Sequence, residues 1–111
     1  MSERYSDFVR RLKEAVLGRP GVTDTGLRQA VEARAATLGG RSGSATGVPP
    51  ALAPFVDKVA QHAFRVTDDD VASLRRAGYS EDAIFEITSS AALGAALGRL
   101  ERGMAALQGG G

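Results

Sequence analysis

Three side chains have the types and spacing needed for acid–base chemistry: Lys58, His62 and Glu86. His62 is the only histidine, and imidazole is the side chain whose ordinary pKa lies near neutrality. Lys58 precedes it by one helical turn, so the two share a helix face. Glu86 is expected to point inward and to supply the carboxylate that a catalytic histidine needs as an orienting partner. The alternative is that His62 is a packed or partly exposed helix residue and Glu86 a solvated one.

Composition excludes several other kinds of chemistry. The chain has 111 residues, 14 of them basic and 13 acidic, and it contains no cysteine. Without cysteine there is no disulfide, thiolate nucleophile or thiolate metal site, and one histidine excludes a multi-histidine site within one chain. The net charge of +1 indicates no general attraction to nucleic acid or anionic lipid. We therefore expect no metal, no cofactor, no nucleic-acid partner and no membrane partner.

The acidic run at 68–70 is explained by helix capping rather than by a metal site. Consecutive residues in a helix diverge by about 100°, so three adjacent carboxylates do not converge on one ion. The region around it superficially resembles a DNA-binding helix-turn-helix, but its second helix begins with Glu81 and Asp82. Their negative charges oppose the approach of DNA phosphates, which makes DNA binding a minor alternative. A protein-interaction module built on 66–107 is a further alternative.

Apolar periodicity and capping residues predict an all-α fold of about five helices. Thr67 and Ser80 are the expected N-caps of the last two helices, and Gly78 ends the helix between them. No segment has the pattern of a strand. The expected helices cover 3–17, 25–38, 51–64, the residues after Thr67, and 81–107.

The chain is expected to form a single domain over 1–111. Within it, 1–38 forms an N-terminal helix pair, 39–50 is a flexible linker rich in glycine, serine and proline, and 51–107 holds the core helices. The N-terminus lacks the apolar core of a signal peptide. The longest uncharged helical stretch, 87–98, is far shorter than a membrane span, so we expect a cytoplasmic protein.

The expected last helix, 81–107, is long and apolar. No charged residue lies between Glu86 and Arg99, and such a helix is buried on most sides. Gly94 and Gly98 lie one turn apart, which allows another backbone to approach closely. A chain of this size can hardly surround so long a helix by itself, so we expect a homo-oligomer that assembles through 81–107.

The segment Phe55-Val-Asp-Lys58-Val-Ala-Gln-His62 resembles a motif of the AhpD-like and carboxymuconolactone decarboxylase-like families. These families are all-helical, and their redox-active members carry Cys-x-x-Cys-x-x-x-His on a helix. With the histidines aligned, Phe55 and Lys58 occupy the cysteine positions. The residues that follow resemble the family's helix, glycine turn and alanine-rich last helix, so the resemblance covers about 51–107.

The resemblance implies an AhpD-like helical bundle that assembles into an oligomer. Peroxidase turnover needs an attacking thiolate and a resolving thiol, and phenylalanine and lysine supply neither. We therefore expect a cysteine-less member without peroxidase activity that binds a small-molecule ligand or a protein partner; whether it is an enzyme at all stays open.

The alternative function is a thiol-independent lyase or isomerase of the decarboxylase-like branch. Lys58 would be the electrophile for a carboxylate substrate, His62 the acid–base group, and Glu86 its partner across the pocket. This hypothesis requires the three side chains to share one cavity, within a subunit or across an interface.

Overall fold

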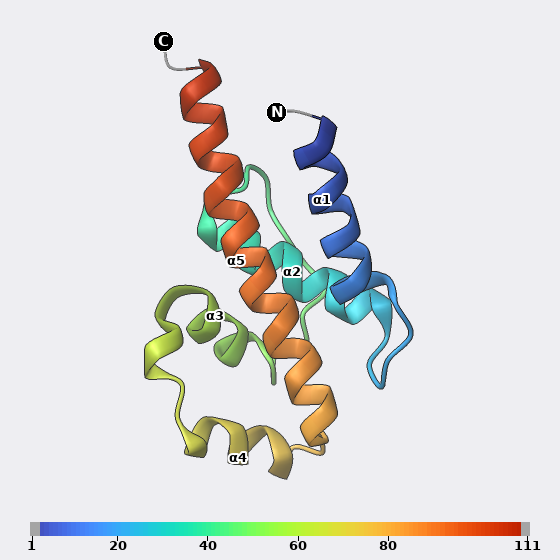
Figure 1. Cartoon of the computed structure of the whole chain (residues 1–111). Helices are drawn as coiled ribbons and strands as arrows, with labels where there is room; N and C mark the ends of the chain where they lie inside the picture. The colour runs from blue at the N-terminus through green and yellow to red at the C-terminus, as the bar shows by residue number, and fades with distance from the viewer. Residues whose placement is uncertain (1–2, 110–111) are drawn as a thin grey trace.

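The structure is a computed structural model that describes residues 3–109. A π-helical turn (η1, Glu14–Gly18) extends the first helix, and a 3-10 turn (η2, Ala63–Arg65) extends the third. No strand occurs among the described residues, so the predicted all-α fold with five helices is confirmed. The α-helices are α1 (Glu3–Lys13), α2 (Thr25–Gly39), α3 (Ala53–His62), α4 (Asp68–Arg76) and α5 (Glu81–Gly109) (Figure 1).

The predicted caps of the last two helices are confirmed. The Thr67 hydroxyl accepts a hydrogen bond from the Asp70 N–H, and the Asp70 carboxylate accepts one from the Thr67 N–H, which together form a capping box. The Ser80 hydroxyl accepts a hydrogen bond from the Ala83 N–H at the start of α5. Gly78 lies between them with a φ of 101°, a conformation that glycine adopts without a steric penalty. Capping therefore explains the acidic run.

The backbone that approaches Gly94 and Gly98 belongs to α2 of the same chain. A Cβ atom on Gly94 would lie 2.2 Å from the Glu32 carbonyl oxygen, and one on Gly98 would lie 2.1 Å from the Ala36 carbonyl oxygen. Figure 1 shows α2 crossing α5 at this point. The two glycines thus serve an internal helix crossing, and they give no argument for a second subunit.

One hydrophobic core joins the helices on both sides of the segment 39–50. Val31 of α2, Val56 of α3 and Ile87 of α5 are fully buried in it, together with Leu52, which directly precedes α3. Val48 packs against the same core from within 39–50.

Arg41 adds a polar connection between the segment 39–50 and two helices. Its guanidinium donates to both carboxylate oxygens of Glu32 on α2 and both of Glu101 on α5. Such paired contacts with planar carboxylates are the geometry that arginine favours. They fix the start of the segment against the crossing of α2 and α5.

The helix α1 lies outside this core. It packs mainly against η1, and none of its residues is buried. Phe8, on its apolar face, keeps 62% of its surface exposed. Leu17 of η1 is the residue that anchors this part of the chain in the interior. Among the described residues, no helix combines the length and apolarity that crossing a membrane requires.

Candidate functional site

Lys58 lies in a shallow pocket between α3 and α4. Its ammonium group donates to the two carboxylate oxygens of Asp70 at 2.9 and 3.1 Å. This ammonium, together with the Thr67 N–H, holds the pKa of Asp70 below its ordinary value. The pocket has a volume of about 170 Å³. Its walls come from Ala51, Pro54, Phe55, Lys58, Asp70, Ser73 and Leu74.

His62 lies at the C-terminal end of α3 with its side chain exposed. Its ring meets the edge of the Phe64 ring, with the centroids 6.1 Å apart. No carboxylate of the described residues forms an ion pair with it, and it does not line the Lys58 pocket. The orienting partner that acid–base catalysis needs is therefore not supplied by its own chain within residues 3–109.

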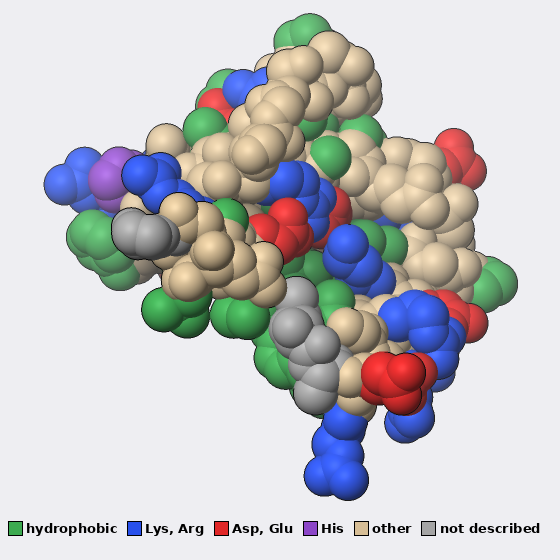
Figure 2. Space-filling view, turned by 90° about the horizontal axis from the view of Figure 1, so that it is seen from above, with side chains coloured by type: hydrophobic (Ala, Val, Ile, Leu, Met, Phe, Trp, Pro, Cys, Tyr) green, Lys and Arg blue, Asp and Glu red, His purple; other side chains and the backbone are tan. Residues whose placement is uncertain are grey.

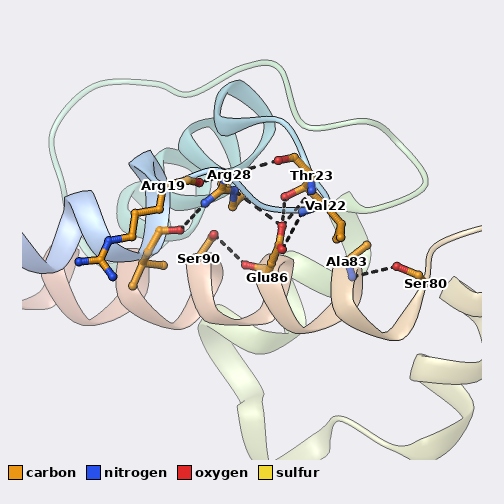
Figure 3. Close-up of polar contacts among 9 residues, drawn as sticks. Arg19, Val22, Thr23, Arg28, Ser80, Ala83, Glu86 and Ser90 are labelled. Atoms are coloured by element: carbon orange, nitrogen blue, oxygen red, sulfur yellow. Dashed lines mark hydrogen bonds and ion pairs between the residues drawn. The ribbon is translucent and has the colours of Figure 1, made fainter.

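Glu86 is held by the loop between η1 and α2. Its carboxylate accepts hydrogen bonds from the backbone N–H groups of Val22 and Thr23, each at 2.9 Å, and from the Thr23 hydroxyl at 2.5 Å (Figure 3). The Thr23 hydroxyl and the Val22 N–H, with Arg28 nearby, hold the pKa of Glu86 below its ordinary value. The prediction that Glu86 points inward agrees with these contacts, and the alternative of a solvated side chain does not.

Arg28 completes this cluster, and sequence reasoning missed it. Only 3% of its surface is exposed, and its guanidinium donates to the carbonyl oxygens of Val16 at 2.9 Å and Arg19 at 2.5 Å. Its Nε lies 3.9 Å from a Glu86 carboxylate oxygen and has no hydrogen-bond partner. Arginine is seldom buried unless it is paired, and here it ties η1 and the following loop to α5.

Glu86 and Arg28 line a second pocket, on the side of α5 that faces η1. Its volume is about 380 Å³. Lys58 and His62 are absent from its walls, which come from Ala15, Val16, Arg19, Pro20, Gly21, Arg28, Phe85, Glu86 and Ser89.

Within one chain, the structure does not bring the three predicted catalytic side chains into one cavity. Lys58 is engaged by Asp70, His62 is exposed at a helix end, and Glu86 is engaged by the loop at 22–23. A shared site would need groups from a second chain. The described residues also contain no group of three or more side chains placed to hold a metal ion.

Comparisons with protein-family models, curated proteins and solved structures found no match for this chain. The AhpD-like assignment therefore depends on the motif that ends at His62 and on the helices that follow it. Of the two positions aligned with the family's cysteines, Phe55 is buried in the core and Lys58 is ion-paired.

Proposed function

We propose that this chain is a cysteine-less, AhpD-like helical protein that assembles with further copies of itself and has no peroxidase activity. The observation that carries the proposal is a pair of exposed apolar side chains on the first and the last helix. They are Phe8 on α1 and Leu107 on α5, whose exposed fractions are 62% and 81%. We call this pair of side chains the end surface.

The two side chains of the end surface lie on α1 and α5, with Phe8 in the middle of α1 and Leu107 near the end of α5. In Figure 1 the start of α1 and the end of α5 lie at the same end of the molecule. The residues of α5 from 103 onward carry no charge, although they form an exposed helix. Figure 2 looks onto this end and shows hydrophobic side chains at the surface among the charged ones.

A second copy of the chain fits this surface better than a charged partner does. Three charged residues of α1 are already paired, because Asp7 contacts Arg10 and Arg11, and Arg10 also contacts Glu14 of η1. Phe8 and Leu107 are apolar, and a two-fold interface would place the same side chains of both copies in contact. This supports assembly through the last turns of the helix 81–107 together with α1.

The burial of these side chains contributes a free energy comparable to the cost of forming a dimer. Burying one phenylalanine or leucine side chain contributes about 1.5–3 kcal/mol, and a two-fold interface buries Phe8 and Leu107 twice. Scaled by the exposed fractions of 62% and 81%, the total is roughly 4–9 kcal/mol, within the range of about 4–15 kcal/mol that association costs.

Light scattering of the purified chain tests the assembly. We expect an oligomer for the unchanged chain and a monomer for Phe8→Glu combined with Leu107→Glu, with the helical circular dichroism retained in both. Phe64→Glu is the matched control, because Phe64 is 82% exposed but lies at the end of α3, away from the end surface. A monomeric unchanged chain, or an oligomer that survives the double substitution, would contradict the proposal.

The absence of peroxidase activity has a separate test. The purified chain is incubated with an organic hydroperoxide and a dithiol donor, and consumption of the peroxide is followed. We expect no turnover, because the chain has no thiol to attack the peroxide. Turnover that is lost in His62→Ala would overturn this part.

A further inference from the structure

The pocket beside Glu86 has the dimensions and lining of a small-molecule site. Its volume of about 380 Å³ lies within the range of roughly 300–1,000 Å³ found for ligand pockets. One part of the wall is apolar and includes Val16, Pro20 and Phe85. Phe85 is 71% exposed, although it belongs to the helix that forms the centre of the fold.

The fold itself uses only some of the polar groups in this wall. The Glu86 carboxylate accepts three hydrogen bonds and is paired with Arg28, so these two charges compensate each other. The Arg19 guanidinium and the Ser89 hydroxyl have no hydrogen bond to any described residue. In Figure 3 the Arg19 guanidinium points away from the pair of Arg28 and Glu86, and no dashed line reaches it.

This distribution of charge favours a negatively charged ligand over a positively charged one. With Glu86 and Arg28 compensating each other, Arg19 leaves the pocket with one net positive charge. A cationic ligand would meet two guanidinium groups, and the one carboxylate of the wall already accepts three hydrogen bonds and faces Arg28. An anion finds the Arg19 guanidinium and the Ser89 hydroxyl as donors, and a guanidinium is well suited to bind a carboxylate.

We propose that this pocket binds a small organic anion with an apolar body, such as an aromatic carboxylate. The carboxylate pairs with Arg19 and accepts a hydrogen bond from Ser89, and the apolar body packs on Phe85. Glu86 and Arg28 position the wall of the pocket by holding η1 and the loop at 19–23 against α5.

Three probes with the same ring and different charge test this proposal. Benzoate, benzamidine and benzyl alcohol are titrated into the full chain, and backbone amide chemical shifts are followed by NMR. We expect saturable shifts with benzoate at 15–21 and 85–89, and weaker binding of the neutral and cationic probes. Equal binding of benzamidine, or no saturable shift with benzoate, would overturn the proposal.

Substitutions locate the site. Arg19→Ala is expected to weaken benzoate binding about tenfold, which corresponds to about 1.4 kcal/mol, because it removes the charged donor of an exposed ion pair. Phe85→Ala is expected to weaken all three probes, and Phe85→Leu restores the apolar wall if alanine perturbs the helix. Arg65→Ala, an exposed arginine at the end of α3, is the matched control and should leave binding unchanged. Unchanged binding in Arg19→Ala would contradict the proposal.

Discussion

Replacing Gly98 by alanine tests the crossing of α2 and α5 directly. An alanine Cβ at this position would lie 2.1 Å from the carbonyl oxygen of Ala36, whereas ordinary van der Waals contact begins near 3.4 Å. The obstacle is backbone, so no side-chain rotation relieves the clash. The two helices must instead move apart by more than an ångström.

Two opposing terms set the size of the effect. Alanine is favoured over glycine in a helix by about 1 kcal/mol, whereas forcing extra volume into a packed contact costs about 1–3 kcal/mol, occasionally more. The separation also weakens the remaining contacts between the helices, because a gap of about 1 Å forfeits up to half of the dispersion attraction. We expect Gly98→Ala to lower the free energy of unfolding by about 2 kcal/mol, and Gly94→Ala, with a Cβ at 2.2 Å from Glu32, to act in the same direction.

Gly103 provides a matched control in the same helix. A Cβ on Gly103 meets no atom within 4 Å, so Gly103→Ala keeps only the helix-propensity gain and should stabilise the chain by up to about 1 kcal/mol. The two variants should therefore differ by roughly 3 kcal/mol.

Thermal unfolding followed by circular dichroism, with urea unfolding as a second measurement, resolves this difference. Each kcal/mol shifts the Tm of a domain of this size by about 4–8 °C, so Gly98→Ala should melt about 10 °C below the unchanged chain. A Gly98→Ala chain as stable as Gly103→Ala would refute the close crossing of α2 over α5.

Three further predictions concern polar contacts. Thr67→Ala removes one half of the capping box of α4 and should lower the free energy of unfolding by about 1 kcal/mol, measured by urea denaturation. Arg41→Ala leaves the buried Glu32 carboxylate without its partner and should cost about 2–3 kcal/mol, part of which Glu32→Gln in the same chain restores. The pKa of Glu86 is depressed in the fold, so its stabilisation is present above its unfolded pKa and is lost as the pH falls through its folded pKa. Urea unfolding at pH 7 and in steps below pH 4.5 should therefore show a smaller acid-induced loss for Glu86→Gln than for the unchanged chain.

The helix boundaries were predictable because they depend on neighbouring residues. Thr67 and Ser80 bond to N–H groups three positions away, and Gly78 provides the turn between their helices. Such contacts form whatever the rest of the chain does. The sequence pattern therefore located both ends of α4 and the start of α5.

The contacts that build the pocket were not predictable in the same way. Arg28 and Glu86 are far apart in the sequence, and only the packing of α2 on α5 brings them together. Arg28 also lies off the apolar stripe of its helix, so periodicity gives no sign that it is buried. The position of Glu86 at the edge of the uncharged stretch indicated that its side chain points inward. That position does not identify Arg28 or the loop at 22–23 as its partners.

The spacing of Gly94 and Gly98 shows the limit of a small-residue pattern. It predicted a close backbone approach, and the structure contains one. The pattern specifies a distance but not whose backbone comes close, and α2 of the same chain fills the place expected for a second subunit. The proposed self-association therefore involves the exposed end of α5 at Leu107 and not the two glycines.

The end surface proposed for assembly and the pocket proposed for the anion are different parts of the molecule. The pocket lies against the start of α5, at 85–89, whereas the end surface includes Leu107 near the other end of the same helix. A helix rises about 1.5 Å per residue, so about 27 Å separates Leu107 from Ser89 of the pocket. Phe8 is nearer to it, about 11 Å along the first helix from Ala15 of the pocket wall. The double substitution of Phe8 and Leu107 should therefore abolish assembly and leave benzoate binding intact, whereas Arg19→Ala should weaken benzoate binding about tenfold and leave assembly intact. A single substitution that removed both properties would mean that the pocket is completed by the second subunit.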